Sequence, residues 1–112
     1  MGTLLADMAT EIEAARTLIW KAAWAADHQE PYDPKLAPMA KVFASEVAHR
    51  VAVRAAEIFG GMGIMAEAPV EKLVRDALTF LHSDGANQIH RVRVGRLLDR
   101  QRGPGPIPGV VV

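Results

Sequence analysis

The histidines are the first candidates for chemistry, because an imidazole can bind a metal ion or transfer a proton near neutral pH. His82 and His90 lie eight residues apart across a glycine break, and His28 and His49 lie elsewhere in the chain. This spacing provides no pair four residues apart on a helix and no other metal-like cluster. The chain has no cysteine, which excludes disulfides, thiolate catalysis and cysteine-bound metal. The sequence therefore predicts no metal site.

Two breaks in the helical pattern hold further candidates. Asp84 and Gly85 precede a helical segment, where an aspartate commonly caps free backbone N–H groups, and Asn87 could support the same turn. Gly60 and Gly61 end an earlier segment, where glycine commonly closes a helix in the left-handed conformation. Judged from the residues alone, both breaks are ordinary helix caps.

Arginines are concentrated in the last helical segment, at positions 91, 93, 96 and 100. No aromatic residue accompanies them, and Asp99 dilutes their charge, so we favour a solvated face or a subunit contact over an RNA or anion site. The whole chain has 13 basic and 13 acidic side chains and a pI near 6.9. This balance gives no reason to expect nucleic acid as a partner.

These candidates must be positioned by helices, because apolar residues recur at steps of three and four in segments 3–27, 34–59, 69–81 and 86–102. The first segment has the longest apolar stripe, formed by Leu5, Met8, Ile12, Ala15, Ile19, Ala22 and Ala26. The last has Ile89, Val92 and Leu97 or Leu98. Prolines at 31, 34 and 38 interrupt the helical pattern between the first two segments.

The expected fold is all-α, an antiparallel four-helix-type bundle of residues 1–102. Residues 103–112 are rich in glycine and proline and are expected to form a flexible tail. No stretch approaches the length of a membrane span, and the N-terminus has no signal or transit pattern. We therefore expect a cytoplasmic protein.

Three parts of the chain resemble the acyl-CoA dehydrogenase family in order and spacing. Residues 4–16 resemble the opening of the second long helix of that family's C-terminal domain. Residues 39–46, 56–63 and 69–77 match its Ala-Lys helix, its Gln-Ile-Phe-Gly-Gly-x-Gly turn and its Pro-(Val/Leu)-Glu helix ending in Arg-Asp-Ala. Residues 84–91 match its Glu-Gly-Thr-x-x-Ile-x-Arg. The resemblance covers nearly all of residues 4 to 98.

The resemblance implies an activity and a cofactor. Members oxidise an acyl-CoA thioester to the trans-2-enoyl-CoA and pass a hydride to FAD, using a helical N-terminal domain, a β domain and a C-terminal helical bundle that also carries subunit contacts. This chain would be that C-terminal domain without its first helix. It would act within a larger enzyme, as a homo-oligomer or with a partner chain that supplies the missing domains, and would be inactive alone. The alternative is a non-catalytic helical oligomerisation module derived from the domain.

The resemblance places Asp84 where many members have the glutamate base that removes the α-proton of the thioester. An aspartate is shorter by one methylene, and misplacement by about 1 Å can reduce a rate on the order of 10²-fold. Asp84 could therefore be the base, a helix cap or both. Some members take their base from a different helix, which would lie before Leu4.

The resemblance also implies contacts with FAD. Gly60 and Gly61 fall on the glycine pair where the backbone approaches the FAD of a neighbouring subunit. Glu57 replaces a glutamine that hydrogen-bonds the adenosine end, and a carboxylate is less suited to a place near a pyrophosphate.

A second group of FAD contacts falls in the last motif, at Gly85, Ala86 and Gln88. Ala86 replaces the usual threonine and lacks its hydroxyl, which leaves Gln88 as the better candidate for a flavin contact.

Overall fold

The structure is a computed structural model that describes residues 2–60, 69–83 and 85–102. It contains four helices: α1 (Gly2–His28), α2 (Leu36–Phe59), α3 (Pro69–Phe80) and α4 (Asn87–Arg102). Within those ranges every regular element is a helix, which confirms the all-α prediction.

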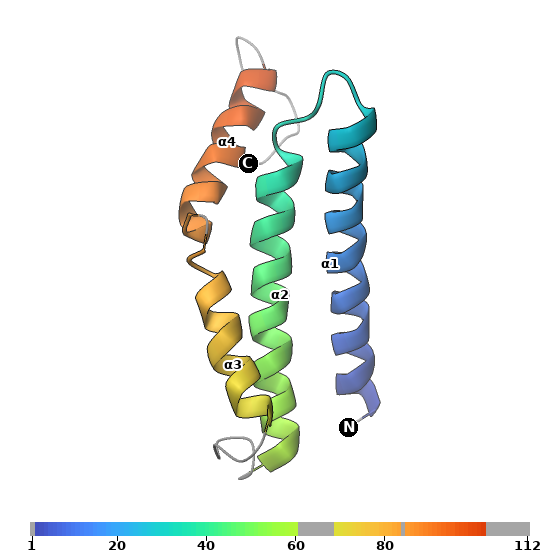
Figure 1. Cartoon of the computed structure of the whole chain (residues 1–112), viewed down its shortest axis with the longest axis vertical. Helices are drawn as coiled ribbons and strands as arrows, with labels where there is room; N and C mark the ends of the chain where they lie inside the picture. The colour runs from blue at the N-terminus through green and yellow to red at the C-terminus, as the bar shows by residue number, and fades with distance from the viewer. Residues whose placement is uncertain (1, 61–68, 84, 103–112) are drawn as a thin grey trace.

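The four helices occupy three columns, as Figure 1 shows. The long helices α1 and α2 are antiparallel neighbours, and α3 and α4 follow one another along the opposite side of α2. In the described part of the chain, α1, α3 and α4 each pack against α2 and against no other helix. The central helix α2 therefore positions every other element.

The connection between α1 and α2 contains two of the three expected prolines, Pro31 and Pro34, and α2 begins at Leu36, two residues after Pro34. The backbone N–H of Lys35 donates to Asp33 Oδ1 at 3.0 Å, and the Lys35 ammonium binds the same carboxylate at 3.1 Å. These two hydrogen bonds lower the pKa of the Asp33 carboxyl. Pro38 lies in the first turn of α2. Backbone N–H groups there have no acceptor within the helix, so a proline, which lacks this group, costs no hydrogen bond.

The core between α1 and α2 differs from the predicted apolar stripe. Met8, Ala15 and Ala22 are buried as predicted, and Ala25 is fully buried in place of Ala26. The other members of the stripe, Leu5, Ile12 and Ile19, are 39–49% exposed. A single neighbouring helix covers only a narrow seam with a repeat of seven residues. The rest of the stripe would need a second neighbour, which the described residues do not supply.

One ion cluster joins α1 to α2. Glu11 accepts hydrogen bonds from Arg50 Nε at 3.2 Å and from Arg54 Nη1 at 3.4 Å.

None of the described helices is long and apolar enough to cross a membrane.

Candidate functional site

The predicted cofactor-binding residues lie at two places along α2. Glu57 and Gly60 lie at its C-terminal end, whereas Gly85, Ala86 and Gln88 lie in the turn that begins α4 beside the middle of α2 (Figure 1). Asn87 contacts Ser45, which is twelve residues before Glu57, so the two places are about 18 Å apart along the helix. The other two predicted site residues, Asp84 and Gly61, lie outside the described residues.

Gly60 ends α2 in a conformation that favours glycine. Its φ is 64° and its ψ is −134°, and its backbone N–H donates to the carbonyl oxygen of Glu57. A Cβ added at Gly60 would meet no atom within 4 Å. Glycine is therefore required here by the backbone conformation, while the space beside it is open.

A hollow of about 510 Å³ lies between α2 and α3 at this end of α2. Its polar lining residues are Glu57, Glu71 and Arg75. Arg75 Nε binds Glu71 Oε1 at 2.8 Å, which leaves the hollow with an excess of one negative charge. Such a lining attracts hydroxyl and amino donors and repels an isolated phosphate.

The turn before α4 is shaped by Gly85, whose φ is 96°. A Cβ at this position would come within 3.1 Å of Nε2 of His90, so both the conformation and the space favour glycine. The Ala86 carbonyl accepts hydrogen bonds from the backbone N–H groups of Ile89 and His90 at 2.9 and 3.3 Å. Ala86 therefore occupies the N-cap position of α4.

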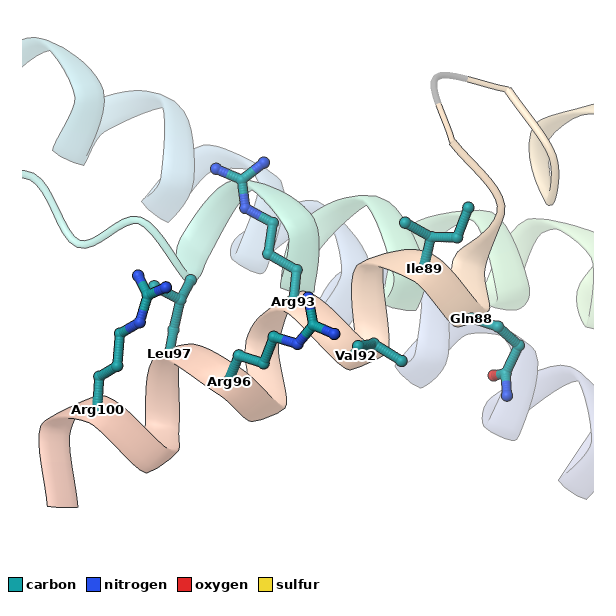
Figure 2. Close-up of a pocket in the computed structure, with 7 residues that line it drawn as sticks. All are labelled: Gln88, Ile89, Val92, Arg93, Arg96, Leu97 and Arg100. Atoms are coloured by element: carbon teal, nitrogen blue, oxygen red, sulfur yellow. The ribbon is translucent and has the colours of Figure 1, made fainter.

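The outward face of α4 carries arginines, as Figure 2 shows. A hollow of about 540 Å³ follows this face and is lined by Gln88, Ile89, Val92, Arg93, Arg96, Leu97 and Arg100. Ile89 is 65% exposed and Val92 is 53% exposed, so these two members of the apolar run in the last helical segment are not buried in this chain. Their face of α4 points away from α2, which is the one helix that α4 contacts in the described part.

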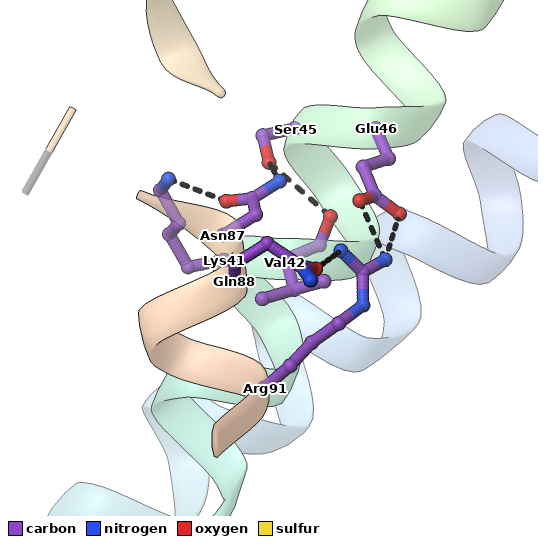
Figure 3. A network of polar contacts seen from close by, with 7 residues as sticks. All are labelled: Lys41, Val42, Ser45, Glu46, Asn87, Gln88 and Arg91. Atoms are coloured by element: carbon purple, nitrogen blue, oxygen red, sulfur yellow. Dashed lines mark hydrogen bonds and ion pairs between the residues drawn. The ribbon is translucent and has the colours of Figure 1, made fainter. Parts of the chain in front are cut away.

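The opposite face of α4 joins α2 through a polar network (Figure 3). Lys41 Nζ donates to Asn87 Oδ1 at 2.6 Å and to the carbonyl oxygen of Gly85 at 3.0 Å. Asn87 Nδ2 donates to Ser45 Oγ at 3.0 Å, and that hydroxyl donates to the carbonyl oxygen of Val42 at 3.2 Å. Asn87 and Ser45 are each only 7% exposed.

Gln88 belongs to a second, more exposed part of this network. Its Oε1 accepts a hydrogen bond from Arg91 Nη1 at 3.1 Å, and Arg91 Nη2 binds Glu46 Oε2 at 2.6 Å. The sequence interpretation did not identify Lys41, Ser45 or Glu46. The lysine of the Ala-Lys helix motif and the asparagine at position 87 were the available signals, but they are 46 residues apart in the chain.

No group of three or more His, Asp or Glu side chains within residues 2–60, 69–83 and 85–102 could hold a metal ion. The arrangement instead presents two backbone turns with positive φ, an acidic hollow and a buried amide network. Comparison with families of known proteins matches residues 1–98 to the C-terminal domain of acyl-CoA dehydrogenases.

The chain belongs to the acyl-CoA dehydrogenase family. Among its relatives, the probable acyl-CoA dehydrogenase YngJ of Bacillus subtilis is 46% identical over 94 residues, which are 84% of this chain and 24% of the relative. The mitochondrial short-chain specific acyl-CoA dehydrogenase of Bos taurus is 43% identical over 99 residues, or 88% of this chain and 24% of the relative. The family resemblance predicted from the sequence is thereby confirmed.

A solved acyl-CoA dehydrogenase has the same fold. The butyryl-CoA dehydrogenase of Megasphaera elsdenii matches with a TM-score of 0.80 and 41% identity, covering 88% of this chain and 26% of that chain. The chain thus spans about a quarter of the length of the acyl-CoA dehydrogenases that it matches.

Proposed function

We propose that this chain is the C-terminal domain of an FAD-dependent acyl-CoA dehydrogenase, which carries out the α,β-dehydrogenation of an acyl-CoA thioester. The observation that carries the proposal is the family match over residues 1–98. The turns at Gly60 and Gly85 support it, because both glycines have a positive φ at positions where the family resemblance implies cofactor contacts.

In this proposal Asp84 is the general base that takes the α-proton of the thioester. FAD, when bound, supplies the acceptor for the hydride that leaves the β-carbon. A carboxylate suits the role of base if the bound acyl chain excludes water, since desolvation raises its pKa toward the working pH. Because aspartate reaches less far than glutamate, we expect turnover to be limited by the reach of Asp84.

The end of α2 is proposed to receive the nucleoside part of an FAD from a neighbouring subunit. The carboxylate of Glu57 is exposed and can accept hydrogen bonds from a ribose hydroxyl or an adenine amino group. The open side of Gly60 leaves room for a close approach to its backbone, and Gly61 would extend that surface. Because Glu57 and Glu71 line the same hollow, the pyrophosphate must lie away from it.

The turn at the start of α4 is proposed to lie against the flavin ring. The Gln88 side chain is exposed, and its amide can hydrogen-bond a polar edge of the ring. Gly85 and Ala86 present backbone and a methyl group only, which permits a close approach without a hydroxyl contact.

The rest of the enzyme must come from outside the matched quarter, either from the same polypeptide or from a partner chain. We expect homo-oligomers of the assembled enzyme and no dehydrogenase activity from this chain alone. The alternative function is a non-catalytic helical oligomerisation module. It is favoured by the exposed apolar side chains of Leu5, Ile12 and Ile19 on α1, which suit a contact with another helix.

A fusion protein tests the proposal. The matched 94 residues of Bacillus subtilis YngJ are replaced by this chain, and the purified fusion is measured for flavin absorbance and for oxidation of butyryl-CoA and longer acyl-CoA thioesters with an artificial electron acceptor. We expect bound flavin and turnover. Asp84→Asn should keep the flavin and abolish turnover, whereas Asp84→Glu should raise turnover by up to about 10²-fold.

Two outcomes would contradict the proposal. A folded fusion without flavin would favour the oligomerisation module, and sedimentation of the isolated chain would then show a defined oligomer. A fusion with flavin whose turnover is unchanged by Asp84→Asn would remove Asp84 from the role of base and point to a base on another helix.

A further inference from the structure

Helix α4 meets α2 through polar contacts and through apolar side chains around one hollow, to which α2 contributes Met39, Val42 and Phe43 and α4 contributes Val94 and Leu98. None of the hydrophobic side chains of α4 is among the buried core residues, and Asn87 is the buried residue of this helix in the described chain. The C-terminal end is held by Lys35 Nζ, which donates to Gln101 Oε1 at 2.7 Å. The middle is held by the exposed pair of Arg91 and Glu46. Exposed pairs of this kind contribute little, and Val94 and Leu97 are only half-buried, so the best-buried contact of α4 lies at its N-terminal turn, at Asn87.

Lys41 contacts that turn. Its ammonium group donates both to the Gly85 carbonyl and to the Asn87 side chain, which joins two consecutive parts of the turn to the middle of α2. The Asn87 side chain in turn donates a hydrogen bond to the buried hydroxyl of Ser45 on α2 (Figure 3). A hydrogen bond with a charged donor is roughly twice as strong as a neutral one.

We propose that Lys41 is a positioning residue that fixes the turn containing Gly85, Ala86 and Gln88. That this turn faces a flavin rests on the proposed function. The clamp, by which we mean the two hydrogen bonds from Lys41 to Gly85 and Asn87, belongs to this chain itself. The two contacts of Lys41 fall at the ends of the segment 85–87. One is the carbonyl of Gly85, whose φ is positive, and the other is the side chain of Asn87, the first residue of α4. Without the ammonium, the Gly85 carbonyl and the Asn87 side-chain oxygen lose their shared donor, and the turn is held on α2 only through Asn87 Nδ2 and the hydroxyl of Ser45.

Amide hydrogen exchange of the isolated chain, read by NMR, tests the clamp without cofactor or substrate. The reporters are the amides of Asn87, Ile89 and His90, which donate to carbonyl oxygens of residues 81 and 86. Lys41→Met keeps the aliphatic stem and removes the donors. We expect exchange of the three reporters to accelerate by about 10- to 100-fold, as a charged hydrogen bond implies, with α1 little changed.

Two further variants make the result specific. Lys72→Met removes an ammonium from an exposed pair with Asp76 on α3 and should leave the three reporters unchanged. Lys41→Arg keeps a charged donor and should restore most of the protection that Lys41→Met loses. The Gly85 amide resonance should shift in Lys41→Met and return toward its original position in Lys41→Arg.

Equal acceleration in all helices of Lys41→Met would mean that Lys41 stabilises the fold in general, and it would overturn the proposal. Exchange rates like those of Lys72→Met would also overturn it, as would an arginine variant that exchanges as fast as the methionine variant. None of these results bears on whether the parent enzyme binds flavin, because that question is answered separately by the fusion protein.

Discussion

Replacing Gly60 with alanine should destabilise the chain, and replacing Gly95 with alanine should stabilise it. An added Cβ meets no atom within 4 Å at either position, so steric clashes contribute to neither result. The difference lies in the backbone, because Gly60 has a φ of 64° and Gly95 lies within α4.

The size of each effect follows from the conformation. An alanine forced to a φ of 64° and a ψ of −134° is strained by about 1–3 kcal/mol, and a less flexible unfolded chain returns about 0.4–1 kcal/mol. The net loss at Gly60 is then up to about 2.6 kcal/mol, with the middle of the two ranges giving about 1.3 kcal/mol. At Gly95 a helical alanine gains about 0.5–1 kcal/mol. Since 1 kcal/mol shifts the Tm of a domain of this size by about 4–8 °C, the two variants should differ by on the order of 10 °C.

Thermal unfolding followed by circular dichroism measures both variants against the unmodified chain. A Gly60→Ala protein as stable as the unmodified chain would show that residue 60 does not hold a positive φ in solution, and the argument for an open backbone surface would fail with it. The flavin content of the fusion protein provides a second measurement. There Gly60→Ala should lower flavin content by more than the loss of stability explains, while Gly95→Ala should leave flavin content unchanged.

Two other predictions concern stability. Asn87→Ala removes two hydrogen bonds from a residue that is 7% exposed, and one of them is to an ammonium. In urea titrations it should lower the free energy of unfolding by about 2 kcal/mol. The control Gln88→Ala, at an exposed position, should change that free energy by less than about 0.5 kcal/mol. Equal effects of the two substitutions would contradict the buried network. The lowered pKa of Asp33 means that its contribution is present at neutral pH and is lost as the pH falls through that lowered pKa. Asp33→Asn should therefore show a smaller loss of urea midpoint than the unmodified chain between about pH 5 and pH 2, and parallel pH profiles would refute this.

The helices could be predicted from the sequence because their limits are local. Proline and glycine end a helix by their own geometry, so the breaks near Pro31, Gly60 and Gly85 follow from single residues, and only details such as the start of α2 at Leu36 differ. The buried side of α1 could be predicted only in part, because Met8, Ala15 and Ala22 are buried as expected but Leu5, Ile12 and Ile19 are exposed. Which flank of an apolar stripe is covered depends on how many neighbours the helix has, and this decided that Ala25 rather than Ala26 is buried.

The candidate site was predictable only through the family resemblance. Periodicity alone would treat Gly60 and Gly85 as caps, and their positive φ values are consistent with that interpretation as well as with cofactor contacts. The contact between Lys41 and Asn87 joins residues 46 positions apart, and no local pattern indicates such a pair. It depends on the path that brings α4 back along α2, which is a property of the whole fold.

The central place of α2 also determines how substitutions in different helices combine. Because α1 and α4 do not touch one another in the described part, changes on their own solvent sides should have additive effects on the free energy of unfolding. Thermodynamic coupling between these solvent-facing positions would pass mainly through side chains of α2, which both helices contact. A double-mutant cycle between solvent-facing residues of the two outer helices would thus report on coupling that α2 transmits.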